Sequence, residues 1–262
     1  MLLENKNAVV YGGSDSVGSA VARAFDHEGA KVFLAGRILA KLDEVAEEIR
    51  SAGGVAETAQ VDALDEHAVQ KHADEVAEKA GSIVISFNAI FNDDVAGTPL
   101  GEMLYDDFAR PITKTMRNQF LTARAVARHM VEQESGVILK ITGGCREVFP
   151  TIGGTVVARA AIEAQCRQWA SELGPQGVRV VWLRTTGLPE AIPNPGDAAD
   201  LGTGYGEGMT REEIIAGMRE QTILKRLASL EALGKVAAFM ASDGAGPMTA
   251  TFVNITCGAV LD

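Results

Sequence analysis

The sequence predicts an α/β fold, namely a doubly wound parallel sheet of the Rossmann type with helices on both faces. Two observations predict it. Short apolar runs alternate with helical segments along nearly the whole chain, and this alternation is typical of parallel strands joined by crossover helices. The apolar runs are also continuous rather than interrupted by polar residues, as expected of strands that are covered on both faces.

The expected elements follow one another in a regular order. Strands are expected at residues 8–11, 31–35, 55–61, 83–86, 137–142, 178–183 and 251–255. Helices are expected at residues 19–28, 39–51, 65–79 and 155–173, with one long or two short helices in 105–133 and two in 211–242. Because the chain shows no repeat, linker or change of composition, a single domain over residues 1–262 is predicted.

One connection is longer than the others. Residues 186–210 are rich in Gly, Pro and Asp, which predicts a loop rather than a helix or strand. A loop of this length is seldom a plain connection in a compact domain, and long loops are often lids. We therefore expect a substrate lid at about 186–210, with Tyr205 able to swing over a bound cofactor.

Charge and composition exclude several classes of partner. The net charge of −11 disfavours binding to nucleic-acid phosphates or anionic lipid. The three cysteines, Cys145, Cys166 and Cys257, match no zinc pattern and indicate a reducing compartment. The first residues are not expected to form a signal peptide, and no apolar run approaches the ~20 residues of a membrane span. A cytoplasmic protein without metal, membrane or nucleic-acid partners is predicted.

A glycine-rich turn follows the first strand. The segment reads Gly-Gly-Ser-Asp-Ser-Val-Gly and leads directly into a helix. Glycines let the backbone approach a pyrophosphate closely, and a helix N-terminus offers N–H groups and a positive dipole end. An ordinary strand–helix turn would look similar, but its place in the first unit suits a dinucleotide site. The expected cofactor contacts here are Gly12, Ser14, Asp15, Ser16, Val17 and Gly18.

An ordered set of segments resembles the short-chain dehydrogenase/reductase family over nearly the whole chain. The family's Gly-x-x-x-Gly-x-Gly turn appears with Ser16 in place of the middle glycine. Further likeness lies in residues 35–37, 61–63, 124–130, 136–138, 160–162, 172–180 and 239–243. The resemblance implies NAD(P) binding, a small-molecule substrate and a homodimer or homotetramer. In the family two helices, here ending near Met130 and starting at Thr155, pair with their symmetry mates.

The end of the second strand bears on cofactor choice. NAD-selective relatives place an acidic residue there for the ribose 2′-hydroxyl, whereas this chain has Gly36 followed by Arg37. A guanidinium clamps a 2′-phosphate well, so NADP is favoured and NAD stays possible, since Asp15 lies in the turn where some NADP-binding relatives have a base.

Three more cofactor contacts follow from the resemblance. Asp62 and Ala63 are expected to contact the adenine. The family's Asn-Asn-Ala-Gly reads Ser86-Phe87-Asn88-Ala89 here. Asn88 is thereby an expected cofactor contact, and Phe87 is expected to make the floor of the cofactor pocket bulkier.

The family's catalytic positions are all substituted. Alignment through residues 159–177 places Thr155 at the catalytic tyrosine and Arg159 at the lysine, which in the family binds the nicotinamide ribose. Counting along the neighbouring segments places Gly143 at the serine and Thr115 at the asparagine. A threonine hydroxyl is far less acidic than a tyrosine, whose pKa is near ~10. Arginine stays protonated, so the family's usual carbonyl reduction is doubtful here.

Substitutes for these groups are few. Cys145 and Arg146 follow the fifth strand at the mouth of the site, and Tyr11 precedes the glycine-rich turn, where it is expected to pack. The four histidines, His27, His67, His72 and His129, are expected at solvent or interfaces.

Three hypotheses remain. The first is an NADP-dependent oxidoreductase with rearranged proton chemistry, the second a non-catalytic dinucleotide-binding protein, either a sensor or a partner subunit. The third is a non-redox enzyme that reuses the fold.

Overall fold

Seven parallel strands form one sheet in the order β3-β2-β1-β4-β5-β6-β7. The computed structural model describes residues 1–90, 94–143, 151–192 and 209–261. The strands are β1 (Asn7–Tyr11), β2 (Lys31–Gly36), β3 (Ala56–Gln60), β4 (Ile85–Asn88), β5 (Gly136–Gly143), β6 (Val178–Thr185) and β7 (Thr251–Ile255). The doubly wound parallel sheet that the sequence predicts is confirmed.

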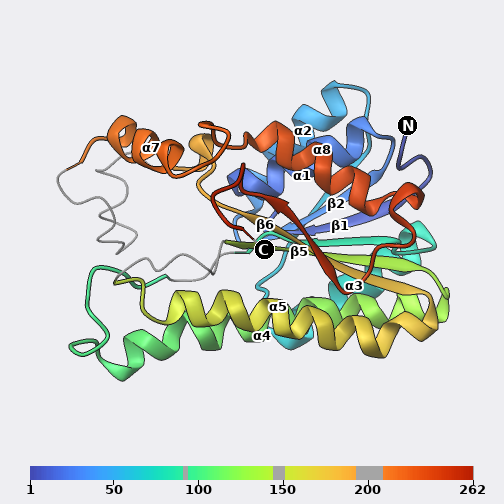
Figure 1. The fold of residues 1–262 in the computed structure, drawn as a ribbon. Helices are drawn as coiled ribbons and strands as arrows, with labels where there is room; N and C mark the ends of the chain where they lie inside the picture. Colours follow the sequence, from blue (N-terminus) through green and yellow to red (C-terminus); the bar gives the residue numbers. More distant parts are fainter. Residues whose placement is uncertain (91–93, 144–150, 193–208, 262) are drawn as a thin grey trace.

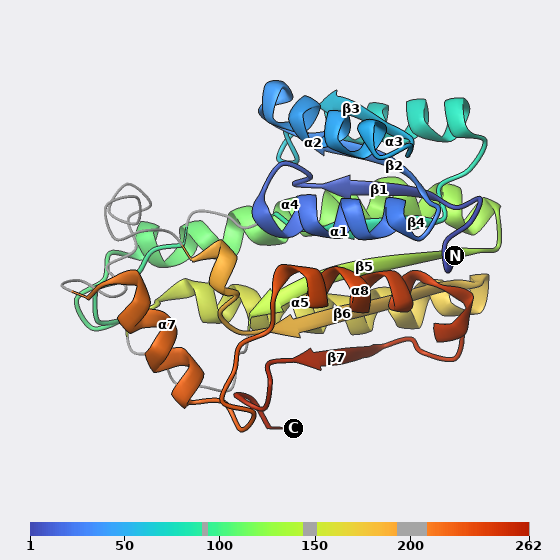
Figure 2. The same ribbon diagram turned by 90° about the horizontal axis from the view of Figure 1, so that it is seen from above.

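Helices cover both faces of the sheet (Figure 1). One face carries α1 (Ser16–His27), α2 (Leu39–Ser51) and α8 (Leu230–Ala241). The other carries α3 (Glu66–Ala80), α4 (Tyr105–Glu132) and α5 (Gly154–Leu173). A further helix, α7 (Arg211–Glu220), lies beyond the carboxyl ends of the strands (Figure 2). Within the described ranges, no helix is long and apolar enough to cross a membrane.

The strand order reverses between β1 and β4. Tyr11, the last residue of β1, pairs with Ala35 of β2 on one side and with Asn88 of β4 on the other. The chain leaves β1 toward α1 and leaves β4 toward α4, on opposite faces. Such a reversal opens a crevice at the carboxyl ends of the strands, where ligands of open α/β sheets bind.

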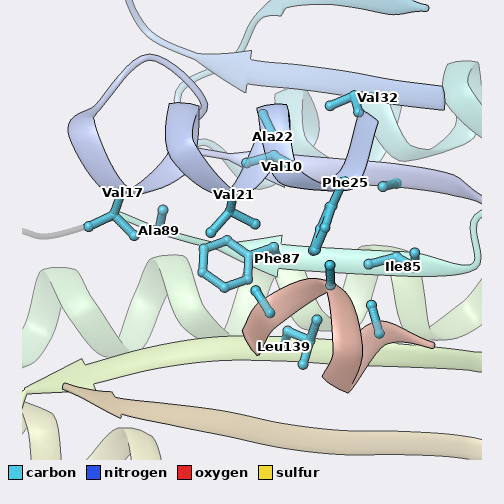
Figure 3. Close-up of a cluster of buried hydrophobic side chains, with 14 of the residues drawn as sticks. Val10, Val17, Val21, Ala22, Phe25, Val32, Ile85, Phe87, Ala89 and Leu139 are labelled. Atoms are coloured by element: carbon cyan, nitrogen blue, oxygen red, sulfur yellow. The ribbon is translucent and has the colours of Figure 1, made fainter. Parts of the chain in front are cut away.

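The core beneath α1 and α8 is apolar (Figure 3). Phe87 lies in it, fully buried, with its ring edge-on to that of Phe25 at 6.3 Å between centroids. The expectation that Phe87 lies at the floor of the cofactor pocket is therefore wrong. Side chains alternate along a strand, and Phe87 shares a face with Ile85 and points into the core.

The observed bounds differ from the expected ones in a few places. Helix α1 begins at Ser16, because Asp15 has an extended backbone (φ −80°, ψ 162°) and serves as its N-cap residue. Residues 105–132 form one long helix, with Pro111 inside it. Of the expected lid, 193–208 lie outside the described residues, and Pro189–Ala191 form one turn of 3-10 helix.

Candidate cofactor and active site

The turn between β1 and α1 requires glycine at both ends. Gly12 has a left-handed backbone (φ 76°), which glycine adopts without strain. A Cβ on Gly18 would lie 2.0 Å from the carbonyl oxygen of Gly12, so only glycine fits there. Between them Ser16 and Val17 form the start of α1, whose first N–H groups have no partner within the helix. The turn has the geometry of an anion-binding loop.

Charged side chains surround this turn. Burial raises the pKa of the Asp15 carboxyl, and the nearby cations of Arg37 and Lys41 oppose that rise. The Asp15 side chain makes no capping hydrogen bond to α1. A Cβ on Gly36 would lie 3.7 Å from Ser14 Oγ, in ordinary contact. Position 36 therefore faces the turn, and Arg37 lies within electrostatic reach of it.

The remaining expected cofactor contacts follow β3 and β4. Asp62 is exposed and its Oδ1 accepts a hydrogen bond from Leu64 N at 3.0 Å, while Ala63 is buried. Asn88 is buried, and its Nδ2 donates to Thr122 Oγ1 at 2.8 Å and to Asn118 Oδ1 at 3.2 Å. The Asn88 side chain thus ties β4 to α4.

Arg159 and Gly143 meet at the carboxyl end of β5. A Cβ on Gly143 would lie 2.7 Å from Arg159 Nη1 and 2.8 Å from its Cζ, so the guanidinium fills the space where a side chain at 143 would begin. Arg159 Nη2 also faces Asp94 Oδ2 at 3.6 Å. Of the four substituted catalytic positions, the structure brings these two into contact.

The two threonines at catalytic positions are both buried. Thr155 is 4% exposed, one helical turn before Arg159 on α5, and its Oγ1 has no hydrogen-bond partner among the described residues. Thr115 is 7% exposed on α4. A Cβ on Gly154 would lie 1.9 Å from the carbonyl oxygen of Phe108, so this glycine lets the start of α5 press directly against α4.

Among the candidate substitutes for the catalytic groups, the structure describes Tyr11 but not three others. Cys145, Arg146 and Tyr205 lie outside the described residues. Tyr11 is 1% exposed, and burial raises the pKa of its hydroxyl far above the usual value. Tyr11 thus packs in the interior, as expected.

One of the four histidines is buried rather than exposed. His72 is 5% exposed, with its ring edge-on to that of Tyr11 at 5.9 Å. The expectation that all four histidines face solvent or an interface is therefore wrong for His72. Burial lowers the pKa of its imidazole to about 4, so His72 is neutral at pH 7.

A buried ionic cluster lies behind the site and was not foreseen. Arg184 at the end of β6 donates to both carboxylate oxygens of Glu163 on α5, from Nε at 3.0 Å and from Nη2 at 2.8 Å. Thr142 Oγ1 of β5 donates to Glu163 Oε1 at 3.3 Å. The Arg184 guanidinium also lies 3.6 Å above the ring centroid of Phe252 on β7.

A buried lysine, Lys140, lies on β5 two residues before Thr142. Lys140 of β5 has no exposed surface, and its Nζ donates to Gln165 Oε1 at 2.6 Å and to Gln119 O at 3.1 Å. Burial lowers the pKa of Lys140 to about 8. The sequence carried a signal for it, because a lysine inside a doubly buried strand must find partners or lose its charge.

Comparisons with known proteins find similarity over nearly the whole chain. A family model described as enoyl-(acyl carrier protein) reductase matches residues 12–259. The uncharacterized oxidoreductase YxbG of Bacillus subtilis is 29% identical over 94% of this chain and 88% of its own length. The probable galactose dehydrogenase GalD of Rhizobium meliloti is 29% identical over 98% of this chain and 95% of its own.

Solved structures share the fold. An NAD⁺-bound xylitol dehydrogenase superposes with a TM-score of 0.87 at 23% identity, over 98% of this chain and 100% of its own. A 7α-hydroxysteroid dehydrogenase complexed with NADH superposes with a TM-score of 0.84 at 23% identity, over 99% of this chain and 96% of its own. With its glycine-rich turn at the reversal of strand order, the chain belongs to the short-chain dehydrogenase/reductase family of NAD(P)(H)-binding oxidoreductases.

Proposed function

We propose that this protein is an NADP(H)-binding oxidoreductase-like member of its family whose proton chemistry differs from the family's. One observation carries the proposal: the Arg159 guanidinium lies directly against Gly143, 2.7 Å from where a Cβ would stand. At the positions of the family's lysine and serine, this chain thus has a single polar side chain, the permanently charged guanidinium of Arg159. Arginine holds its proton at any physiological pH, so Arg159 is a binding group rather than a proton relay.

The burial of Thr155 supports a second candidate, a non-catalytic dinucleotide-binding protein. Its hydroxyl is 4% exposed, and an alcohol is far too weak an acid to replace a tyrosine. Loss of a positioned general acid lowers a rate by about 10²–10⁴-fold. Under both candidates, ordinary aldehydes and ketones are turned over far below the usual enzyme range.

The preference for NADP(H) rests on the residues around the first turn. Gly36 leaves the end of β2 without the acidic group that holds a ribose 2′-hydroxyl, and Arg37 with Lys41 supplies positive charge beside Asp15. A guanidinium that binds a 2′-phosphate with paired hydrogen bonds contributes roughly 1–3 kcal/mol, or about 5- to 150-fold in affinity.

Calorimetric titration with NADPH and NADH tests the proposal. The protein should bind NADPH more tightly, and Arg37→Ala should weaken NADPH binding alone by about 5- to 150-fold. Gly36→Asp, whose Cβ has room, should shift the preference toward NADH. Equal affinities for both cofactors in the wild type would refute the preference.

A turnover panel of aldehydes and ketones, run with the better cofactor, separates the two candidates. Weak turnover that is lost in Arg159→Gln supports the oxidoreductase, and none at all supports the binding protein. Robust reduction of a simple ketone would contradict both.

We further propose a homo-oligomer that pairs through the outer surfaces of α4 and α5. Val157, Ala160 and Ala164 are exposed along α5, and Phe120 is 41% exposed on α4. Ala158, on the same helix, is buried against its own chain and is not part of this surface. Small exposed residues permit close helix approach, and two-fold pairing is the commonest arrangement of soluble oligomers. Light scattering that finds a stable monomer would refute it.

A further inference from the structure

We propose that Arg159, lying over Gly143, binds a carboxylate group of the protein's small-molecule ligand. The inference rests on the proposed function, because it names the class of compound that the same site accepts. It concerns the half of the crevice at β5, not the glycine-rich turn at β1.

The contact between the two residues is built for the guanidinium. A Cβ on Gly143 would lie 2.7 Å from Arg159 Nη1, 2.8 Å from Cζ and 3.0 Å from Nε. Real Cβ atoms essentially never come that close to a neighbour, so a side chain at 143 would make the arginine head shift. The observed position of the guanidinium therefore requires glycine at 143.

The guanidinium has donors to spare. It carries five N–H groups in a planar fork. Its one ion pair in the described chain is with Asp94 at 3.6 Å, and no hydrogen bond from it to the described residues is found. The Arg159 side chain is 26% exposed, so a ligand can reach it. One turn earlier on α5, the buried Thr155 Oγ1 has no hydrogen-bond partner among the residues that the structure describes.

The position selects the ligand rather than the cofactor's phosphates. The site stands at the carboxyl end of β5, and β4 separates β5 from β1 in the sheet. Two strand spacings place it roughly 10 Å from the turn that suits a pyrophosphate. The charge selects a carboxylate: a single guanidinium, already near Asp94, matches one planar, singly charged group bidentately.

Thermal unfolding with a matched pair of probes tests this. Phenylacetate should raise the melting temperature in a saturable manner, because a ligand that binds only the folded state stabilises it. Phenylacetamide, of the same shape but uncharged, should not. Both series are run without cofactor and with saturating NADPH, and the carboxylate effect should persist in both. NADPH binding itself is titrated separately, so failure of cofactor binding is distinguished from failure of carboxylate binding.

Three variants locate the effect. Arg159→Gln should weaken the apparent affinity for phenylacetate about 10- to 100-fold. Gly143→Ala should weaken it too, although the charge remains, because its Cβ displaces the guanidinium; this variant keeps the test available if Arg159→Gln fails to fold. Arg167→Gln is the matched control, an exposed arginine two turns further along α5, and should behave as the wild type.

Several outcomes would overturn the proposal. They are an equal shift with phenylacetamide, an unchanged shift in both Arg159→Gln and Gly143→Ala, and an equal shift with inorganic phosphate that depends on Arg159. Loss of the carboxylate effect on addition of NADPH would assign Arg159 to the cofactor instead.

Discussion

The two faces of the sheet differ in the kinds of side chain that they bury. Beneath α1, α2 and α8 the buried core is formed by aliphatic and aromatic side chains such as Val10, Val21, Phe25 and Phe87. Beneath α3, α4 and α5 the described interior also holds four ionisable side chains of Lys, Glu, Arg and His. They are His72, Lys140, Glu163 and Arg184. Both faces belong to one sheet, so the difference lies in the side chains that the strands and the covering helices contribute to each face.

The polar face is the one that carries the candidate active site. Glu163 lies one helical turn beyond Arg159 on α5, and its carboxylate joins α5 to Thr142 of β5 and Arg184 of β6. Buried ion pairs contribute little net stability, but their geometry is demanding. Our hypothesis is that this cluster fixes the position of α5 on the sheet, and with it Arg159 and Thr155. In the described part of the chain, no buried ion pair joins α1, α2 or α8 to the sheet, and the Arg179 guanidinium donates only to backbone carbonyls at and beyond the end of α8.

The strongest test of this comparison removes one partner of the buried pair. Glu163→Gln keeps the shape of the side chain but removes the negative charge that faces the buried Arg184 guanidinium at 2.8 Å. Breaking such a pair costs about 3–5 kcal/mol, to be measured as the unfolding free energy in urea.

The matched control for that variant lies on the apolar side of the molecule. Glu231→Gln breaks the exposed pair between Glu231 and Lys235 on α8 and should leave the unfolding free energy unchanged, because solvent screens exposed pairs. A loss below about 1 kcal/mol in Glu163→Gln, the range of exposed pairs, would contradict the picture of a structural ion pair.

Much of the fold was predictable because each strand could be recognised from its own residues. The predicted strand at 251–255 has the same bounds as the observed β7, and the two helices predicted within 211–242 are α7 and α8. The direction of the Phe87 side chain could also be predicted from the sequence. Side chains alternate along a strand, so Phe87 shares a face with Ile85 and Ala89.

Pairings between distant residues were harder. Glu163 and Arg184 lie 21 positions apart on different elements, and nothing local marks them as partners. The same holds for Gly143 and Arg159. The sequence predicts each of these two substitutions separately, but their contact is seen only in the three-dimensional structure.

A smaller effect is expected from His72, through pH. Burial lowers the pKa of its imidazole to about 4 from 6.5, so between these values the unfolded chain binds a proton that the folded chain does not. Stability is therefore lost as the pH falls through this window, by roughly 1.5 kcal/mol between pH 6.5 and 5. His72→Phe should remove this part of the loss in urea denaturation at the two pH values.

The control for that variant is His67→Gln on the same helix, where the side chain is exposed; it should follow the wild type. If His72→Phe loses as much stability on acidification as the wild type does, the histidine is solvated or paired.

The smallest expected effect is at the alkaline end and comes from Lys140. Burial lowers the pKa of its ammonium to about 8 from 10.5. Above pH 8 the unfolded state therefore binds more protons than the folded state, and stability rises with pH, by about 1 kcal/mol between pH 8 and 9. Burial also raises the pKa of Cys166 to about 11 from 9.0, which acts in the opposite direction above about pH 9 and sets the upper limit of the window.

Lys140→Met tests this prediction, because it keeps the length of the side chain and removes the charge. Its unfolding free energy in urea should be nearly flat between pH 8 and 9, whereas that of the wild type should rise. Since an apolar replacement of a buried charge is often neutral or stabilising, the variant should also fold at pH 7. A wild type and a variant with the same pH dependence would mean that Gln119 and Gln165, which hold the Lys140 Nζ, compensate fully for its burial. The polar face would then differ from the apolar face in composition but not in its response to pH at this strand.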